Sequence, residues 1–377
     1  GRAMEIVYDD ESLRDYFDRA VRVSEERPVL VDCFLEDAFE ADVDALSDGT
    51  DVVIGAVMEH IEEAGIHSGD SACVLPPYLI PPHAVEQMKA HAIAMAKALG
   101  VVGLMNAQFA YKDGVVYVIE VNPRASRTVP FVSKAIGVPL ASVAARLMVG
   151  ESLAEIGFTR EIVPPFVSVK EAVFPFNKFR EADPVLGPEM RSTGEVMGID
   201  EDFGTAFLKS QVAADNVLPR EGAVFLTVND SDKPAAATLA ERLHALGFGL
   251  FATAGTAAFL EARGVPVTRV LKVAEGRPHG VDLIVNGEVQ LLVNTPLGKD
   301  AQQDDERLRK AALGNRVPYT TTLSAANAAC DAIAARRQRD PGVRPLQAWH
   351  ALVHGGEAPG TVHGAAGVAQ TLEGGAA

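Results

Sequence analysis

The stretch VYVIEVNPR, residues 116–124, decides how the first part of this chain is interpreted. Its β-branched and aromatic residues are typical of a strand, and side chains two residues apart on a strand project from the same face. Glu120 and Asn122 therefore place two oxygen-bearing side chains on one face. Such oxygens are the ligands that Mg²⁺ prefers, so the pattern suits a metal site, although in an arbitrary sequence the same pattern is more often the plain end of a surface strand.

The preceding strand supplies a third oxygen. Residues 101–111 have the pattern of a strand that turns near residues 112–114 and returns through 115–121. A three-residue turn with Gly114 in the left-handed conformation would place Gln108 opposite Val118, on the face that carries Glu120. We therefore expect Gln108, Glu120 and Asn122 to converge on a metal ion, and Arg127 to reach a transferring phosphoryl group as a fixed cation.

The residues before this hairpin predict further helices and strands, and a stripe of acids. Glu40, Asp42 and Asp44 alternate along one strand, which is most simply a solvated strand face. The expected elements are a helix that Asp9 or Asp10 caps and that ends before Pro28, a buried strand at 29–34, a hairpin at 40–60 that turns at Asp48-Gly49, and a helix from Pro82 that Gly100 closes.

From about Glu221 the pattern changes to alternating strands and helices. This alternation favours a small doubly wound parallel sheet, distinct from the hairpin-rich first part, with the boundary near residues 215–220. The fold class expected for the whole chain is α/β. The alternating segments are 223–228, 233–246, 248–253, 257–263, 267–272, 281–285, 289–294, 304–313, 319–323 and 325–336.

Composition excludes some classes of function. Hydrophobic residues make up 48% and charged residues 23% of the 377 residues, as in globular proteins. The formal net charge of −17 repels a phosphate backbone, so we expect no nucleic-acid partner. No apolar run reaches the roughly 20 residues that a membrane-spanning helix needs, and no secretory pattern opens the chain. We therefore expect a cytoplasmic protein without a membrane partner.

Residues 115–128 resemble the strand and loop that carry the magnesium ligands of ATP-grasp enzymes. The longer run 103–150, with GLMN at 103–106, EVNPRA at 120–125, RTVPFVSK at 127–134 and GVPL at 137–140, closely resembles the second synthetase half of the carbamoyl phosphate synthetase large subunit. The resemblance extends from residue 1 to about residue 337. It implies a ligase that makes carbamoyl phosphate from bicarbonate, ammonia taken from glutamine and two ATP, with this half phosphorylating carbamate.

The resemblance also implies a division into domains. Residues 1–150 would be the metal- and nucleotide-binding part of an ATP-grasp domain, an antiparallel sheet with helices whose N-terminal lobe is missing. Residues 151–218 would complete the synthetase domain, 219–340 would form a methylglyoxal-synthase-like allosteric domain, and 341–377 would be a largely disordered tail. Because the first lobe is missing, we expect this chain alone to turn over carbamate poorly or not at all.

Residue roles follow from the same resemblance. Gln108, Glu120 and Asn122 would hold the metal, and Arg127 would contact phosphate. Leu35 would contribute to the adenine pocket and Glu40 would accept hydrogen bonds from the ribose. The loop residues Gly65, Ile66, His67 and Ser68 would touch the nucleotide.

Two effector sites are implied as well. Glu62, Asp70, Glu171 and Thr321 would surround ornithine, since carboxylates suit its ammonium groups. A phosphate pocket for uridine monophosphate would use Lys233, Thr253, Thr256, Lys272 and Asn294, at strand ends beside helix N-termini. Pro296 and Lys299 depart from the Thr and Arg common in this pocket, so the fold is more secure than inhibition by uridine monophosphate.

The implied cofactors are ATP, Mg²⁺ or Mn²⁺, and K⁺, and the implied macromolecular partner is a glutaminase small subunit, in a heterodimer that could form higher oligomers. Two alternatives stay open. Another ATP-grasp carboxylate-amine ligase should lack the domain that begins near Glu221. A non-catalytic effector-binding module would bind nucleotide without turnover. A methylglyoxal synthase would leave the long first part without a purpose.

Overall fold

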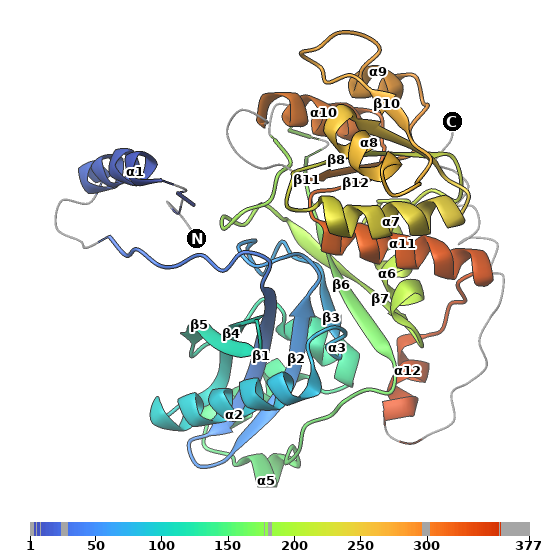
Figure 1. The fold of residues 1–377 in the computed structure, drawn as a ribbon. Coiled ribbons are helices and arrows are strands. Elements are labelled where there is room, and N and C mark those ends of the chain that lie inside the picture. The colour runs from blue at the N-terminus through green and yellow to red at the C-terminus, as the bar shows by residue number, and fades with distance from the viewer. Residues whose placement is uncertain are drawn as a thin grey trace.

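The computed structural model describes residues 4, 6–7, 9–23, 29–176, 178–179, 183–295, 302–353 and 355, which form two sheets with their helices (Figure 1). Helix α1 (Asp10–Val23) stands away from both sheets in this view. The expected residues Pro296 and Lys299 lie outside the described residues.

The first sheet is antiparallel and has seven strands. Helix α2 (Pro82–Ala98) covers one face with its alanines and Met88, against Val43 and Phe109. Helices α3 (Val129–Ile136) and α4 (Leu140–Met148) pack on the opposite face against Leu46 and Met58, and a short helix, α5 (Leu153–Ile156), follows. In spatial order the strands are β5 (Val115–Asn122), β4 (Val102–Lys112), β1 (Phe39–Asp48), β2 (Val52–His60), β3 (Cys73–Leu75), β6 (Val167–Val173) and β7 (Gly194–Asp200).

The second sheet is parallel, and its strand order reverses at β8, as a doubly wound sheet requires. Helices α7 (Lys233–Ala245), α8 (Ala254–Glu261) and α11 (Leu323–Gln338) share a core with one face, and α9 (Gly280–Val285) and α10 (Gln302–Gly314) with the other. The strands are β10 (Thr268–Val270), β9 (Gly249–Thr253), β8 (Ala223–Val228), β11 (Leu291–Thr295) and β12 (Tyr319–Thr320). The expected α/β fold class, an antiparallel sheet followed by a parallel one, is confirmed.

Helix α6 (Phe203–Ala213) joins the two sheets. One continuous apolar core runs from Val169 of the first sheet through Phe207 to Leu226 and Ile333 of the second. The helix approaches its neighbours very closely at Gly198: a Cβ added there would lie 2.0 Å from the carbonyl oxygen of Ala206. Only glycine fits such an approach, so β7 and α6 are held in direct backbone contact.

Outside the sheets, the structure differs from two expectations. The buried strand expected at residues 29–34 is wrong: these residues form no strand, and Leu30 and Val31 are exposed. An apolar run forms a strand only where a neighbour pairs with it, and in the described part of the chain none does. Within the expected tail, residues 346–353 form helix α12 (Leu346–Val353), whose Trp349 is buried against Phe166.

Among the described residues, no single helix is long and apolar enough to cross a membrane. Helices α3 and α4 reach the required length and composition only as a pair, bent by 110°. Much of both helices is buried against the first sheet.

Candidate functional site

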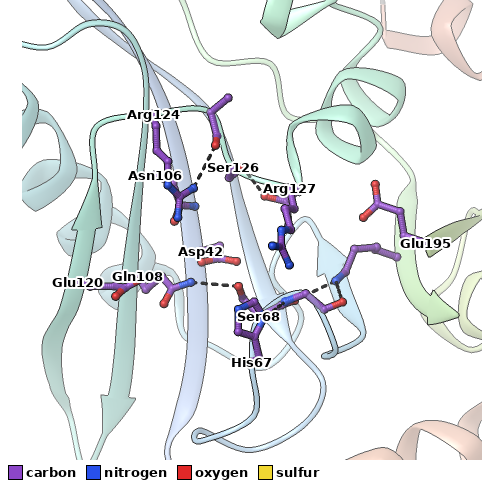
Figure 2. A pocket seen from close by; sticks show the side chains of 14 residues that line it. Asp42, His67, Ser68, Asn106, Gln108, Glu120, Arg124, Ser126, Arg127 and Glu195 are labelled. Carbon is purple, nitrogen blue, oxygen red and sulfur yellow. Dashed lines mark hydrogen bonds between the residues drawn. The ribbon is translucent and has the colours of Figure 1, made fainter. Parts of the chain in front are cut away.

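A polar pocket of about 400 Å³ opens beside β1 and β4, on the face away from α2 (Figure 2). It brings together five residues that the sequence predicted for the site, His67, Ser68, Gln108, Glu120 and Arg127. Figure 2 shows Arg127 reaching toward the loop that carries His67 and Ser68. The remaining lining residues are Asp42, Gly69, Asn106, Arg124, Ala125, Ser126, Thr128, Lys170 and Glu195.

The expected three metal ligands lie on one face, although the register that we derived for them is wrong. The turn has two residues, Asp113 and Gly114, with φ of 51° and 83°, and it pairs Lys112 with Val115. A bulge after Gln108 then shifts the pairing so that Gln108 lies opposite Glu120 rather than Val118. The bulge returns the side chain of Gln108 to the face that carries Glu120. The expected three-residue turn would have placed it on the same face without a bulge.

The donor set of this face suits a hard cation. Asn122 donates from Nδ2 to Glu120 Oε1 (2.8 Å), and Gln108 donates from Nε2 to Ser68 Oγ (3.1 Å). Because these bonds engage the amide NH₂ groups, the amide oxygens remain as ligand atoms. Within the described ranges no cluster of three His, Cys, Asp or Glu could hold a metal. One carboxylate and two amides fit Mg²⁺ that is also held by phosphate oxygens.

Asp44 clamps the loop that carries Arg127. Its buried carboxylate accepts hydrogen bonds from Asn106 Nδ2 (2.9 Å), Ser126 Oγ (3.0 Å) and Thr128 Oγ1 (3.1 Å). Burial raises the pKa of Asp44 to about 6, while these donors oppose the rise. Since Ser126 and Thr128 flank Arg127, the clamp fixes the backbone from which the guanidinium extends.

The acidic stripe on β1 is therefore not the solvated face that we expected. Glu40, Asp42 and Asp44 are all buried, because other side chains cover this face of β1: His60 lies against Glu40 and Asp42, and Asn106, Ser126 and Thr128 lie against Asp44. Asp42 accepts from His60 Nε2 (3.2 Å), which lowers the Asp42 pKa although burial opposes this. The pKa of His60 is raised well above its ordinary value: burial disfavours the imidazolium, but Cys73, Glu40 and Asp42 outweigh it.

Glu40, the residue expected to bind the ribose, lies beside the loop. Burial raises the pKa of Glu40, and the backbone N–H of Gly65 donates to its carboxylate. The ring of Phe34 lies against Gly65, where an added Cβ would be 3.1 Å from it. Leu35 is half-buried in the irregular chain before β1, and Ile66 is half-buried in the loop. Neither lines the pocket.

Lys170 is the main residue that the sequence analysis missed. It is fully buried on β6, and its ammonium donates to the carbonyl oxygen of Ser68 (3.0 Å). Asp42, Glu171 and Glu195 surround it and help to raise its pKa, although burial opposes this. A lysine inside the apolar strand VSVKEAV, residues 167–173, is the signal that could have identified it.

The acids expected around ornithine only partly converge. Burial is the main cause that raises the pKa of Glu171 to about 8, and the negative charge of the nearby Glu62 raises it further. Asp70 instead accepts from the backbone N–H groups of Arg191 (2.7 Å) and Ser192 (2.9 Å). Thr321 is half-buried before α11, and no described contact joins it to the acids.

The residues expected to bind phosphate gather at the strand ends of the second sheet. Thr253 and Thr256 lie at the start of α8, and the Thr256 hydroxyl accepts from the N–H of Val228 (3.4 Å). Lys233 Nζ lies over Gly255, 3.2 Å from where a Cβ would be. Asn294 is buried at the end of β11, whereas Lys272 is exposed just beyond β10.

Comparison with known proteins defines the class of each half. Residues 1–156 match the family described as the carbamoyl-phosphate synthase L chain, ATP binding domain. Residues 235–321 match the MGS-like domain. The chain therefore combines an ATP-binding domain with an MGS-like domain.

Curated relatives are similar over almost the whole chain. The carbamoyl phosphate synthase large chain of Gemmatimonas aurantiaca is 77% identical over 97% of this chain and 33% of that protein. The large chain of Pseudomonas syringae pv. tomato is 56% identical over 93% of this chain and 32% of that protein. The C-terminal section of the large chain of Aquifex aeolicus is 53% identical over 88% of this chain and 65% of that protein.

The chain belongs to the carbamoyl phosphate synthase large chain family and corresponds to its C-terminal section. It spans about a third of the length of the full-length curated relatives. Among solved structures, the biotin carboxylase domain of Hydrogenobacter thermophilus 2-oxoglutarate carboxylase, in complex with MgADP, ADP and bicarbonate, is 16% identical with a TM-score of 0.46. It covers 56% of this chain and 53% of that one, a likeness too weak to support an argument.

Proposed function

We propose that this chain supplies part of the site that phosphorylates carbamate with ATP to form carbamoyl phosphate. The observation that carries this proposal is the convergence of Gln108, Glu120, Arg127, His67 and Ser68 on one pocket. The proposal includes the remaining implied partners, a glutaminase small subunit and higher oligomers, and the implied Mn²⁺ and K⁺.

The residues would divide the work by their chemistry. Bound Mg²⁺ would offset charge on the ATP phosphates, held by the oxygens of Gln108, Glu120 and Asn122. Arg127, fixed by the Asp44 clamp, would stabilise negative charge that develops on the transferring phosphoryl group. No side chain need act as a nucleophile, since a carbamate oxygen can attack the γ-phosphoryl group directly. The His67–Ser68 loop would lie over the nucleotide.

The metal face gives a direct test. Glu120→Ala removes the carboxylate among the three proposed ligands, so the Mg²⁺-dependent gain in ADP affinity is expected to fall by about tenfold or more. Titration calorimetry of this chain with ADP, in Mg²⁺ and in chelator, measures that gain. Glu241→Ala, which changes an exposed helical glutamate, is the matched control. Equal Mg²⁺ dependence in Glu120→Ala and the parent chain would contradict the assignment.

We further propose that the second sheet binds effectors, uridine monophosphate at Lys233, Thr253, Thr256, Lys272 and Asn294, and that ornithine binds near Glu62, Asp70, Glu171 and Thr321. The support is the gathering of Lys233, Gly255 and Thr256 at strand ends, where backbone N–H groups and a cation favour phosphate. This effector-binding role is also the second candidate function if the chain has no turnover of its own.

Calorimetric titration with uridine monophosphate tests this site. Thr256→Ala removes a hydroxyl at the start of α8 and is expected to weaken binding by about tenfold, whereas the control Thr268→Ala, on exposed β10, should not. Binding that both variants retain unchanged would place the nucleotide elsewhere. Ornithine, titrated into the same samples, should bind all three chains alike.

A further inference from the structure

Residues 183–192, which we call the connecting segment, precede β7 in the first sheet but contact the second domain. Asp183 accepts two hydrogen bonds from Arg309, from Nε to Oδ1 (3.0 Å) and from Nη2 to Oδ2 (2.8 Å). Arg309 extends from α10 and is fully buried. Its third contact, from Nη1 to Asn294 Oδ1 (2.7 Å), reaches the proposed phosphate pocket.

The rest of the connecting segment holds the loop of the nucleotide pocket. The carbonyl oxygen of Gly187 accepts from the N–H of His67 (2.9 Å). The Asp70 carboxylate accepts from both Arg191 and Ser192 N–H groups, and Ser192 Oγ donates to the carbonyl oxygen of Gly69 (3.2 Å). These bonds come from outside the loop, so they fix where its pocket-lining residues lie.

The connecting segment is also tied to itself. The guanidinium of Arg191 donates to the carbonyl oxygen of Asp183 (2.6 Å), so its two ends move together. An unbroken chain of hydrogen bonds thus runs from Asn294 through Arg309, Asp183 and Arg191 to Asp70. Such a chain is a physical route by which two sites can be coupled.

Arg309 is the link that can change. A buried guanidinium needs partners for all its donors, and a bidentate carboxylate is its strongest one. Asp305 lies nearby as a second acid: burial raises its pKa, and the positive charge of Arg309 opposes that rise. A ligand that drew Asn294 or Arg309 toward itself would therefore loosen Asp183 without leaving the guanidinium unpaired.

We propose that Arg309 positions the pocket loop from the second domain: it fixes Asp183, and the connecting segment then fixes the loop from His67 to Asp70. This rests on the proposed function for what each pocket binds, but the link itself is independent of the ligands. A phosphate-bearing ligand at Asn294 would act on the nucleotide pocket through this segment.

Hydrogen exchange of the whole chain tests the link. Asp183→Asn removes the charge from a partly exposed residue but keeps an amide oxygen that can accept from Arg309, while Arg309→Gln removes the guanidinium itself. Both are expected to speed exchange of the His67, Arg191 and Ser192 amides by about tenfold or more, with β8 and β9 unchanged. Arg307→Gln, on the exposed side of α10, is the matched control. Unchanged exchange of those three amides in Asp183→Asn would overturn the proposal, even if Arg309→Gln unfolds.

A ligand arm separates this proposal from the proposed effector. Uridine monophosphate should change exchange of the His67 amide in the parent chain and lose that effect in Asp183→Asn. The same effect in both chains would overturn coupling through the segment. Absence of nucleotide binding would contradict the effector assignment instead, and the exchange of the unliganded variants would still decide the link.

Discussion

Replacing Lys170 with methionine is expected to lower the free energy of unfolding by about 3–5 kcal/mol. Lys170 is fully buried, and its ammonium lies among Asp42, Glu171 and Glu195. Methionine fills a similar volume but leaves Asp42 and Glu195 without the cation they share, and the carbonyl oxygens of Ser68 and Gly69 without a donor. The loss exceeds that of a surface ion pair because buried charge is poorly solvated.

Urea unfolding of this chain measures the effect. Lys97→Met, in the exposed last turn of α2, is the matched control and should change stability by less than about 0.5 kcal/mol. ADP affinity should fall in Lys170→Met as well, since the loop loses an anchor. If Lys170→Met were as stable as the control, the ammonium would not be compensating the acids around it.

Glu171→Gln is expected to make the protein more stable at high pH, and increasingly so as the pH rises. Burial, followed by the charge of Glu62, raises the pKa of Glu171 from 4.5 to about 8. The folded chain thus holds a proton that the unfolded chain has already lost. The stability due to this group is complete below about pH 4.5 and is lost as the pH rises to about 8. A glutamine side chain does not titrate in this pH range, so Glu171→Gln does not lose this stability as the pH rises.

Unfolding free energies measured from about pH 5 to pH 9 should therefore fall more steeply in the parent chain than in Glu171→Gln, by at most about 1.4 kcal/mol per pH unit. Glu241→Gln, on an exposed helix face, should follow the parent chain. Parallel curves for Glu171→Gln and the parent would mean that Glu171 is ionised in the folded protein at neutral pH.

Local sequence patterns predicted most helices and strands because each carries its own signal. Alternating apolar residues and the turn residues 112–114 predicted the β4–β5 hairpin, and strand–helix alternation predicted the second sheet. The shared face of Gln108 and Glu120 was predicted correctly from a wrong turn length, because a bulge compensated for it. A bulge depends on contacts across the strands, which a single strand does not reveal.

The interior polar contacts could not be predicted in the same way. Whether Asp42 and Asp44 face water depends on the side chains that cover their face, such as His60 of β2 and Asn106 of β4, and a single strand does not reveal these. The partners of Arg309 are 126 and 15 residues away along the chain. No periodicity marks such pairs, so the contacts of Asp44 and Arg309 emerge only when the folded chain brings their partners together.

The close approach of α6 to its neighbours limits how such proteins can be recombined. A Cβ at Gly204 would lie 2.7 Å from the carbonyl oxygen of Asp331 on α11, and Gly198 permits the still closer approach of β7, where the corresponding distance to Ala206 is 2.0 Å. A chimera that exchanges the second sheet for that of a relative, in order to change its response to effectors, would have to carry α6 and α11 as a matched pair. A junction placed near residue 220, between those helices, would instead combine surfaces that have not adapted to each other.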